Sequence, residues 1–452
     1  MTTAPLTVPG RSSLGSAVAY GAFLACSWTW CIGMFLPVLL VRDYGIWGWI
    51  VFAIPNVVGA AAMGLIPRNE QSLRNLLAQH RSATRLFSLV TIAFHLFFNG
   101  WIIRRLLPGY GPSLTIALAI LMYLIISPPT RRDLLLSIIV LAISFLALSL
   151  ATDLKDVNFP RSISLQSTPI LFSLAASCFF GFLLCPYLDL TFHRARRSAG
   201  AFAPRAFVFG FFAFFAMILF FSLRYATFLA PLLTDPSALE SAGTPGAAII
   251  LGLYMSLQSA FTIAVHWREL IGNLASANRG RTIALAVAVF LVPVILGIVS
   301  QEPLRFFGLA GGEVFYRCFM GFYALYFPAY VYLCIIPRRT SFLVYAVAVI
   351  LATPLFFAAF ILNHMLLLLP ALAIVLLAKL LPLRASVPFP FRVYLCASVV
   401  TMPALWQAPN VSASSPVAAT VQALTRSSAR SPSPRCTNTT SKSSASRTAS
   451  WA

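Results

Sequence analysis

In this chain of 452 residues, 59% are hydrophobic and only 10% are charged, which excludes an ordinary soluble domain, where about 25% are charged. The formal net charge of +21 does not indicate nucleic-acid binding, because the basic residues lie between apolar segments and not on one soluble domain. The eight cysteines have the spacing of neither a zinc site nor a disulfide framework. The composition therefore predicts a protein whose main partner is the lipid bilayer, with no nucleic acid, no metal site and no cofactor.

Apolar runs recur along most of the chain, and a helix that spans a bilayer needs about 20 predominantly apolar residues. By that rule we expect an all-α polytopic membrane protein with about twelve transmembrane helices. The expected segments lie near 15–41, 46–66, 84–103, 112–128, 134–151, 167–192, 206–230, 247–266, 282–300, 315–336, 341–362 and 365–382. Whether a shorter run at 391–406 also spans is left open.

Basic residues are concentrated in alternate loops between these segments. If the N-terminus, 1–14, is cytoplasmic, the cytoplasmic loops, among them 68–82 and 193–205, hold most of the basic residues. The outer loops 152–165 and 231–246 then hold acidic residues. Since positively charged loops stay inside, we predict a short cytoplasmic N-terminus and a multi-pass protein of the plasma (inner) membrane.

Two segments carry matching interruptions. The first reads Cys31-Ile-Gly-Met-Phe-Leu-Pro37 and the sixth reads Phe180-Gly-Phe-Leu-Leu-Cys-Pro186. A Pro removes a backbone hydrogen bond and a Gly adds freedom, so we expect these helices to unwind near Gly33–Pro37 and Gly181–Pro186. The two segments run in opposite directions, so a five-helix unit repeated once is inverted. Interrupted helices at corresponding positions indicate a transporter site, although Gly and Pro are common in membrane helices anyway.

This pattern divides the chain into four further regions. We expect a first five-helix repeat at 15–151, a second at 166–336, additional C-terminal membrane helices at 341–406 and a tail at 407–452. The tail is rich in Ser, Thr, Ala, Pro and Arg and has almost no bulky apolar residue. Such a segment cannot bury a core, so we expect it to be disordered.

Asp189 is the only acidic residue that lies well inside an apolar segment. An ionisable residue in a membrane segment is a functional candidate by default. If the helix restarts after Pro186, Asp189 lies in its first turn and His193 lies one turn further on. This pair could exchange a proton, or Asp189 could hold a cationic group. The structural alternative is a kinked helix in which Asp189 pairs with His193 or Arg197 at the membrane surface.

Two more groups of polar residues share helix faces. His95 and Asn99 are spaced four apart in the third segment, and Ser256, Ser259 and Thr262 recur every three residues in the eighth. Hydroxyl oxygens suit a hard cation such as sodium. Hydrogen bonding between helices explains both groups equally well.

Tryptophans and glycines in the first two segments indicate close packing. Trp28 and Trp30 lie in the middle of a segment and not at an interface, so we expect them to pack between helices more readily than to line a cavity. Gly59 and Gly64 in the second segment are suited to close contact between helices.

The inverted five-plus-five plan, the broken first helix of each half, the hydroxyl-bearing eighth helix and two extra helices resemble the amino acid–polyamine–cation (LeuT-type) superfamily, which includes sodium/solute symporters. The resemblance covers roughly 14–382. It implies that the solute binds between the first and sixth helices, and that a sodium ion lies between the first and eighth. The implied substrate-binding residues are Ser27, Thr29, Gly33, Gly181, Cys185, Tyr187 and Asp189. The implied ion-coupling residues are Ser259, Thr262, Asp189 and His193.

The expected function is that of a secondary transporter for a small polar solute, coupled to sodium or protons, and not that of an enzyme. One alternative is a membrane-embedded transferase, because Asn363-His364 begins like an acyltransferase motif, although Leu369 stands where that motif has Asp. A second alternative is a non-transporting membrane sensor or scaffold. The sequence has no ATP-binding P-loop pattern, which argues against a primary pump.

Overall fold

A computed structural model of the chain describes residues 14–66, 70–127, 131–151, 168–231, 245–272, 279–301, 304–337 and 342–380. Eight helices in this part are long and apolar enough to cross a membrane, and four shorter helices are also apolar. The prediction of an all-α polytopic membrane protein is therefore confirmed. The predicted tail, most of the predicted N-terminal segment and the ambiguous run at 391–406 lie outside the described residues.

The described part consists of helices and one short strand pair, in which β1 (Arg305–Phe306) and β2 (Leu309–Ala310) lie antiparallel. The α-helices are α1 (Leu14–Trp28), α2 (Cys31–Leu65), α3 (Glu70–Gln79), α4 (Arg81–Phe98), α5 (Arg104–Leu106), α6 (Gly111–Ile126), α7 (Arg132–Ala151), α8 (Thr168–Leu184), α9 (Leu190–Ala199), α10 (Ala203–Val208), α11 (Ala216–Leu229), α13 (Pro245–Gly272), α14 (Arg279–Val299), α15 (Gly311–Gly321), α16 (Phe327–Tyr330), α17 (Phe342–Phe360) and α18 (Leu368–Ala378). Short π- or 3₁₀-helical pieces join them: η1 (Asn99–Ile103), η2 (Cys185–Leu188), η3 (Gly200–Phe202), η4 (Phe209–Phe215), η6 (Phe322–Tyr326), η7 (Val331–Ile335) and η8 (Met365–Leu367).

Helix α2 folds back on itself at Gly45, which has a φ of 61° and a ψ of −153°. A Cβ atom added to Gly48 would collide with the carbonyl oxygen of Leu40. Eight residues of straight helix span about 12 Å, so this contact requires a reversal of the chain. A left-handed φ suits glycine, because it has no Cβ atom. The α2 element thus contains the end of the first predicted segment and the whole of the second.

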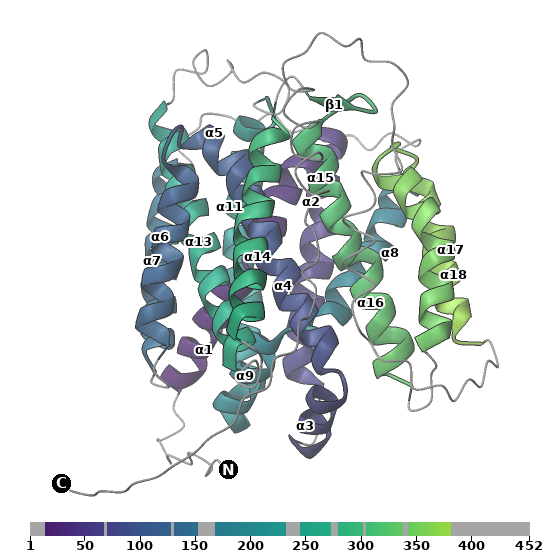
Figure 1. Cartoon of the computed structure of the whole chain (residues 1–452), viewed down its shortest axis with the longest axis horizontal. Coiled ribbons are helices and arrows are strands. Elements are labelled where there is room, and N and C mark those ends of the chain that lie inside the picture. Colours follow the sequence, from purple (N-terminus) through teal and green to yellow (C-terminus); the bar gives the residue numbers. More distant parts are fainter. Residues whose placement is uncertain are drawn as a thin grey trace, which may run out of the picture. The chain divides into compact units, whose positions relative to one another are not determined.

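The helices run between two ends of the bundle. The short helices α3 and α9 lie at one end, together with the start of α1, whereas α5 and the β1 strand lie at the opposite end (Figure 1). We refer to these as the α3 end and the β1 end. The predicted cytoplasmic loops 68–82 and 193–205 include α3 and α9, so their described residues lie at the same end, as an inverted five-plus-five plan requires.

Glycines allow the helices to approach closely. A Cβ atom on Gly59 would lie 2.7 Å from the backbone nitrogen of Leu183, where α2 crosses α8. A Cβ atom on Gly21 would lie 3.1 Å from the backbone nitrogen of Gly210, where α1 crosses η4. Gly64 packs in the same way against the ring of Phe207. The expected role of Gly59 and Gly64 in close helix contact is confirmed.

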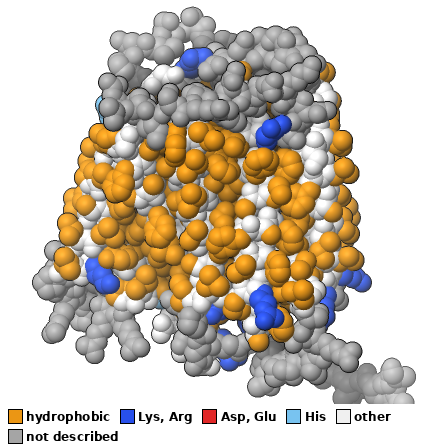
Figure 2. All heavy atoms as spheres, turned by 180° about the vertical axis from the view of Figure 1, so that it is seen from behind, with side chains coloured by type: hydrophobic (Ala, Val, Ile, Leu, Met, Phe, Trp, Pro, Cys, Tyr) orange, Lys and Arg blue, Asp and Glu red, His pale blue; other side chains and the backbone are white. Residues whose placement is uncertain are grey.

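Many apolar side chains lie on the outer surface. On the face shown in Figure 2, hydrophobic side chains cover a broad central band, and Lys and Arg side chains lie toward its upper and lower margins. Helix α7 exposes Leu135, Leu146 and Leu150 while it buries Val140 and Leu148. Apolar side chains on both faces of a helix fit a bundle whose solvent is lipid, and basic residues at the margins fit the headgroup regions.

We expect Gly59→Val to destabilise the fold by about 1–3 kcal/mol, because the added side chain has no space between α2 and the backbone of α8. Thermal unfolding in detergent, followed by size-exclusion fluorescence, measures this loss. Gly246→Val is the matched control, since a Cβ atom there meets nothing within 4 Å. Equal melting temperatures for the two variants would contradict the close contact.

We also expect cysteines introduced at Asn75 in α3 and at Ser198 in α9, both exposed positions, to be labelled from the same side of the membrane. A cysteine at Arg305 in β1 should be labelled from the opposite side. Labelling with a membrane-impermeant maleimide in right-side-out and inverted vesicles measures this, with the unmodified chain as the background control. Labelling of positions 75 and 198 from opposite sides would be incompatible with the observed arrangement.

Candidate functional site

The first helix break lies at Thr29 and Trp30. Helix α1 ends at Trp28, α2 begins at Cys31, and Trp30 has an extended backbone with a φ of −84° and a ψ of 170°. The predicted unwinding near Gly33–Pro37 is therefore wrong, because both residues lie inside the helical first half of α2.

Side chains that capture the carbonyls at the end of α1 explain the position of this break. The hydroxyl of Thr29 donates to the carbonyl of Ala25 at 2.8 Å, and the indole nitrogen of Trp30 donates to the carbonyl of Ser27 at 2.6 Å. The Trp30 bond replaces the one that the backbone nitrogen of Cys31 would make to Ser27 in a continued helix, whereas the carbonyl of Ala25 also keeps its helical bond from the nitrogen of Thr29. Pro37 remains in a helix because proline removes only one hydrogen bond, a loss that neighbouring helices can compensate in a membrane protein.

The second break lies at η2 and Asp189. Helix α8 ends at Leu184, Pro186 is in the first turn of η2, and α9 begins at Leu190. An interruption at Pro186 is therefore confirmed. Gly181 is not unwound; it lies inside α8, where an added Cβ atom would be 2.7 Å from the carbonyl oxygen of Tyr323.

Asp189 is the N-cap of α9. Its Oδ1 atom accepts hydrogen bonds from the backbone nitrogen and from the hydroxyl of Thr191, both at 2.7 Å. A carboxylate at this position is stabilised by the positive end of the helix. Asp189 is fully buried within the protein. The alternative of an ion pair with Arg197 at the membrane surface is therefore wrong.

His193 lies one turn after Asp189, as predicted, and its ring is bonded to the second break. Its Nε2 atom donates to the carbonyl of Tyr187 at 2.8 Å, and its backbone nitrogen donates to the carbonyl of Asp189 at 3.2 Å. The ring thus satisfies a carbonyl that the interruption of α8 releases.

The histidine that faces the free oxygen of Asp189 is His266 of α13. Its Nε2 atom lies 4.0 Å from Oδ2 of Asp189, and both side chains are fully buried. The same imidazole lies beside Trp30, with ring centroids 6.0 Å apart. His266 therefore lies between the two helix breaks. No sequence pattern singled out His266, although it stands one turn after Thr262 and continues the polar stripe of that helix.

Helix α13 also reaches the carbonyl end of α1. The hydroxyl of Thr262 lies 3.5 Å from the carbonyl oxygen of Cys26, and the Oγ atom of Ser259 is buried without a hydrogen-bond partner among the described residues. The hydroxyl of Ser27 instead donates within α1, to the carbonyl of Leu24 at 3.2 Å.

Helix α4 supports the start of α2. The Nε2 atom of His95 accepts a hydrogen bond from the backbone nitrogen of Cys31 at 3.3 Å, while its Nδ1 atom donates to the carbonyl of Thr91 at 2.8 Å. These two contacts assign the proton of the neutral ring to Nδ1. The side chain of Asn99 donates to the carbonyl of His95 at 2.6 Å, within its own helix. Hydrogen bonding between helices therefore accounts for His95 but not for this bond of Asn99.

Trp28 packs between helices, as expected. Its indole nitrogen donates to the side chain of Asn56 at 2.8 Å, and its ring lies 4.9 Å from that of Phe192. The ring of Trp30 packs 5.2 Å from that of Tyr323. These contacts connect the first break with α2, α9 and η6.

The predicted site residues are only partly brought together. Gly33 points away from the second break, because an added Cβ atom would lie 3.4 Å from the ring of Phe215 in η4. Cys185 donates to the carbonyl of Tyr323 at 3.3 Å. The predicted residues at or beside the two breaks are Ser27, Thr29, Cys185, Tyr187, Asp189, His193 and Thr262, whereas Ser259 lies one turn before Thr262 on α13.

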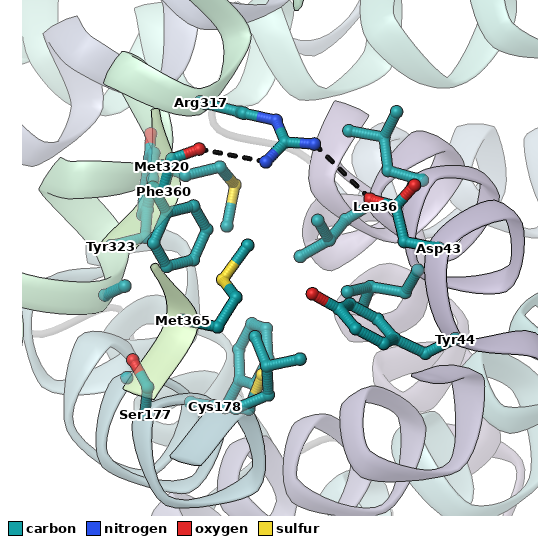
Figure 3. A pocket seen from close by; sticks show the side chains of 16 residues that line it. Leu36, Asp43, Tyr44, Ser177, Cys178, Arg317, Met320, Tyr323, Phe360 and Met365 are labelled. Carbon is teal, nitrogen blue, oxygen red and sulfur yellow. Dashed lines mark hydrogen bonds and ion pairs between the residues drawn. The ribbon is translucent and has the colours of Figure 1, made fainter. Parts of the chain in front are cut away.

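A mostly apolar pocket lies toward the β1 end, between α2, α8 and η6 and beside the end of α17 (Figure 3). Its rim carries Arg317, which donates to Asp43 at 3.4 Å and to the carbonyl of Phe360 at 2.9 Å. Gly181 and Tyr323 also line it. Tyr323 therefore contacts both the pocket and Trp30. The other lining residues are Leu36, Leu39, Leu40, Tyr44, Leu174, Ser177, Cys178, Phe182, Met320, Ala324 and Met365.

A cluster of four charged side chains lies at the β1 end. Arg42 pairs with Glu313 at 2.8 Å and with Asp43 at 2.7 Å. Arg317 pairs with Glu313 at 2.5 Å and with Asp43 at 3.4 Å. The cluster is formally neutral and ties the first half of α2 to α15.

A second cluster of the same composition lies at the α3 end. Arg194 pairs with Asp133 and, at 2.8 Å, with Glu269. Arg268 pairs with Glu269 at 3.2 Å and with Asp133 at 3.5 Å. This cluster ties α9 to α7 and α13. The two clusters therefore hold four of the acidic side chains, and Asp189 takes part in none of their ion pairs.

The chemistry that this interior offers is limited and specific. It supplies one carboxyl group, imidazoles, hydroxyls and the carbonyl and N–H ends of broken helices, which are the ligands that transporters use for small solutes and ions. The described residues include no group of three or more His, Cys, Asp or Glu side chains that could hold a metal ion.

We expect His95→Ala to destabilise the protein by about 1–3 kcal/mol, because the buried N–H group of Cys31 loses its acceptor. The free energy of unfolding in detergent, or the melting temperature, measures the loss. His364→Ala is the control, since His364 is exposed. Equal stability of the two variants would show that this hydrogen bond does not support the break.

Comparison with known proteins provides no independent evidence about the function of this site. The sequence matches no protein-family model and no curated protein, and the structure matches no solved structure. The chemistry at the two helix breaks therefore follows from the residues that form them.

Proposed function

We propose that the chain is a secondary transporter of a small polar solute, coupled to sodium or protons, in the plasma (inner) membrane with its N-terminus in the cytoplasm. The observation that carries this proposal is the meeting of two interrupted helices in the interior. His266 lies between the break at Trp30 and the break at Asp189. Broken membrane helices are tolerated where protein or a cavity satisfies their backbone groups, and transporters bind solutes at such breaks.

The packing of the helices supports an inverted five-plus-five repeat. A symmetry operation that exchanges the first segment with the sixth also exchanges the second with the seventh. It relates the crossing of the first and seventh segments at Gly21 and Gly210 to the crossing of the second and sixth at Gly59 and Leu183. In each half, a broken helix is followed by a glycine with a positive φ, Gly45 or Gly200.

On this plan we count twelve spanning segments. The first consists of α1 and the first half of α2, the second of the rest of α2, and the sixth of α8, η2 and α9. The others are α4 to α5, α6, α7, α10 to α11, α13, α14, α15 to η7, α17 and α18. This count follows from dividing α2 at Gly45 and the long helical stretch 190–229 at Gly200. The proposed first repeat then ends with α7, and the second with η7.

The charge clusters suggest how the site alternates between the two sides. Each cluster joins one half of a broken helix to its neighbours, Arg42 at the β1 end and Arg194 at the α3 end. Opening either end therefore separates only the ion pairs of that end. Asp133, Glu313 and Arg317 are buried, and the cost of removing such charges from water offsets much of their attraction, so hydration of an opened end can replace these pairs. The pocket below Arg317 is the proposed entry route for the solute.

The alternatives are a membrane-embedded transferase and a non-transporting sensor or scaffold. Both alternatives are compatible with this fold, but neither predicts that a solute crosses the bilayer. Both would be favoured over transport if no solute accumulates in vesicles that contain folded protein.

The direct test is uptake into proteoliposomes of a panel of radiolabelled amino acids, amines, nucleobases and sugars, with sodium or proton gradients applied separately. We expect one solute class to accumulate, and Asp189→Asn to abolish its gradient-driven uptake. If the sodium gradient drives uptake, the double variant Ser259→Ala, Thr262→Ala should weaken the sodium dependence. His364→Gln, at an exposed position, serves as the control. Wild-type uptake by the Asp189→Asn variant would remove Asp189 from the site.

A further inference from the structure

Two unsatisfied polar atoms face one another in the interior. Neither Oδ2 of Asp189 nor Nε2 of His266 has a hydrogen-bond partner among the described residues. They lie 4.0 Å apart, and both side chains are fully buried. Native proteins rarely leave buried polar atoms without partners, and such atoms call for a functional explanation.

Each of these two groups is fixed through its other atom. Oδ1 of Asp189 is held by the two bonds from Thr191, each 2.7 Å long. Nδ1 of His266 lies 3.3 Å from the hydroxyl of Ser88 on α4. The free oxygen and the free nitrogen are thus oriented by neighbours on two elements, α9 and α4.

The arginines next to this pair in the α3-end cluster form ion pairs with other acidic residues. Arg194 on α9 and Arg268 on α13 pair with Asp133 and Glu269 at the α3 end. Oδ2 of Asp189 lies 4.0 Å from Nε2 of His266, which is too far for a hydrogen bond. The other titratable groups on the elements packed around the pair are Arg81, Arg85 and His95 on α4, Cys185 and Tyr187 in η2, His193, Arg196 and Arg197 on α9, Tyr254 and Glu269 on α13, and Tyr323 and Tyr326 in η6.

An ionised carboxylate is costly in such a place unless it is paired, whereas a protonated carboxyl group is neutral. Sodium would need several oxygen ligands around it, since hard cations bind through oxygens. The group that lies 4.0 Å from Oδ2 of Asp189 is an imidazole nitrogen of His266, whose ring packs against the indole ring of Trp30. A proton is the cation that one oxygen and one imidazole nitrogen can bind.

We propose that Asp189 and His266 form a proton-binding site and that the proton is the coupling ion of this chain. The second part of this inference rests on the proposed transport function. A proton from water at the open end forms an O–H bond on Oδ2 of Asp189. The neutral carboxyl group donates this hydrogen to the lone pair on Nε2 of His266 when the gap between them shortens. His266 keeps its own proton on Nδ1, toward Ser88. Release to the other side breaks the same O–H bond and restores the carboxylate.

Infrared difference spectroscopy of the full chain in lipid nanodiscs, between acidic and alkaline buffers, tests the proton site without any solute. We expect a carboxylic acid C=O stretch that disappears as the pH rises. Asp189→Asn should lose this band, and His266→Gln should shift its frequency, because the hydrogen-bond acceptor changes. His364→Gln should leave the band unchanged. Replacing potassium with sodium at constant pH should also leave it unchanged.

Three results would overturn the assignment: an unaltered band in Asp189→Asn, an unshifted band in His266→Gln, or loss of the band when sodium is added. The sodium comparison needs only the wild-type chain. Asp189→Glu, which keeps the carboxyl group and should shift the band, replaces Asp189→Asn if that variant is not monodisperse. Failure of the transport proposal gives a different result, in which the band behaves as expected but no solute accumulates in proteoliposomes.

Discussion

The structure depends on one constraint: every backbone N–H and C=O group that a helix break releases inside a bilayer needs a partner from the protein, because lipid offers none. The two breaks meet this requirement largely with side chains. Trp30 bonds the carbonyl of Ser27, His95 accepts from the N–H group of Cys31, and His193 donates to the carbonyl of Tyr187. These residues are fully or nearly fully buried, although each carries a polar ring. The polar interior is therefore first a set of supports for broken helices, and the atoms left over after that role are the ones available for binding.

Of the buried polar atoms without a hydrogen-bond partner in the described residues, two lie near each other at the breaks. The free oxygen of Asp189 and the free nitrogen of His266 lie between the breaks, and the unbonded hydroxyl of Ser259 lies on the same helix as His266. Balanced charge clusters lie toward both ends, so the interior holds one acidic side chain without an arginine partner from either cluster. Close contacts at glycines hold the helices near enough for short side chains to bridge the breaks. The site is thus a product of packing, and no single helix contains it.

The sequence predicted the second break well and the first one poorly. Pro186 cannot donate a backbone hydrogen bond, and the interruption lies where it stands. Pro37 has the same local defect but stays in a helix, while Thr29 and Trp30 end α1 by bonding its last carbonyls. A proline in the sequence indicates that one backbone hydrogen bond is missing, but it does not indicate which neighbouring side chain replaces that bond. The prediction that the helices unwind at Gly33 and Gly181 was wrong for the same reason. Both glycines lie within helices, where they allow Phe215 and Tyr323 to approach closely.

The sequence by itself determined the membrane class, the all-helical architecture and most of the positions at which the chain crosses or turns, because hydropathy and segment length depend only on neighbouring residues. It also placed Asp189 beside a helix break. Only the tertiary structure decided which group Asp189 faces. His193 is its neighbour along the helix, but the ring of His193 reaches back to Tyr187, and His266 approaches Asp189 from a helix far along the chain. The local periodicity of the sequence cannot predict that Asp189 and His266 lie close together, because this contact depends on the packing of helices that are distant in sequence.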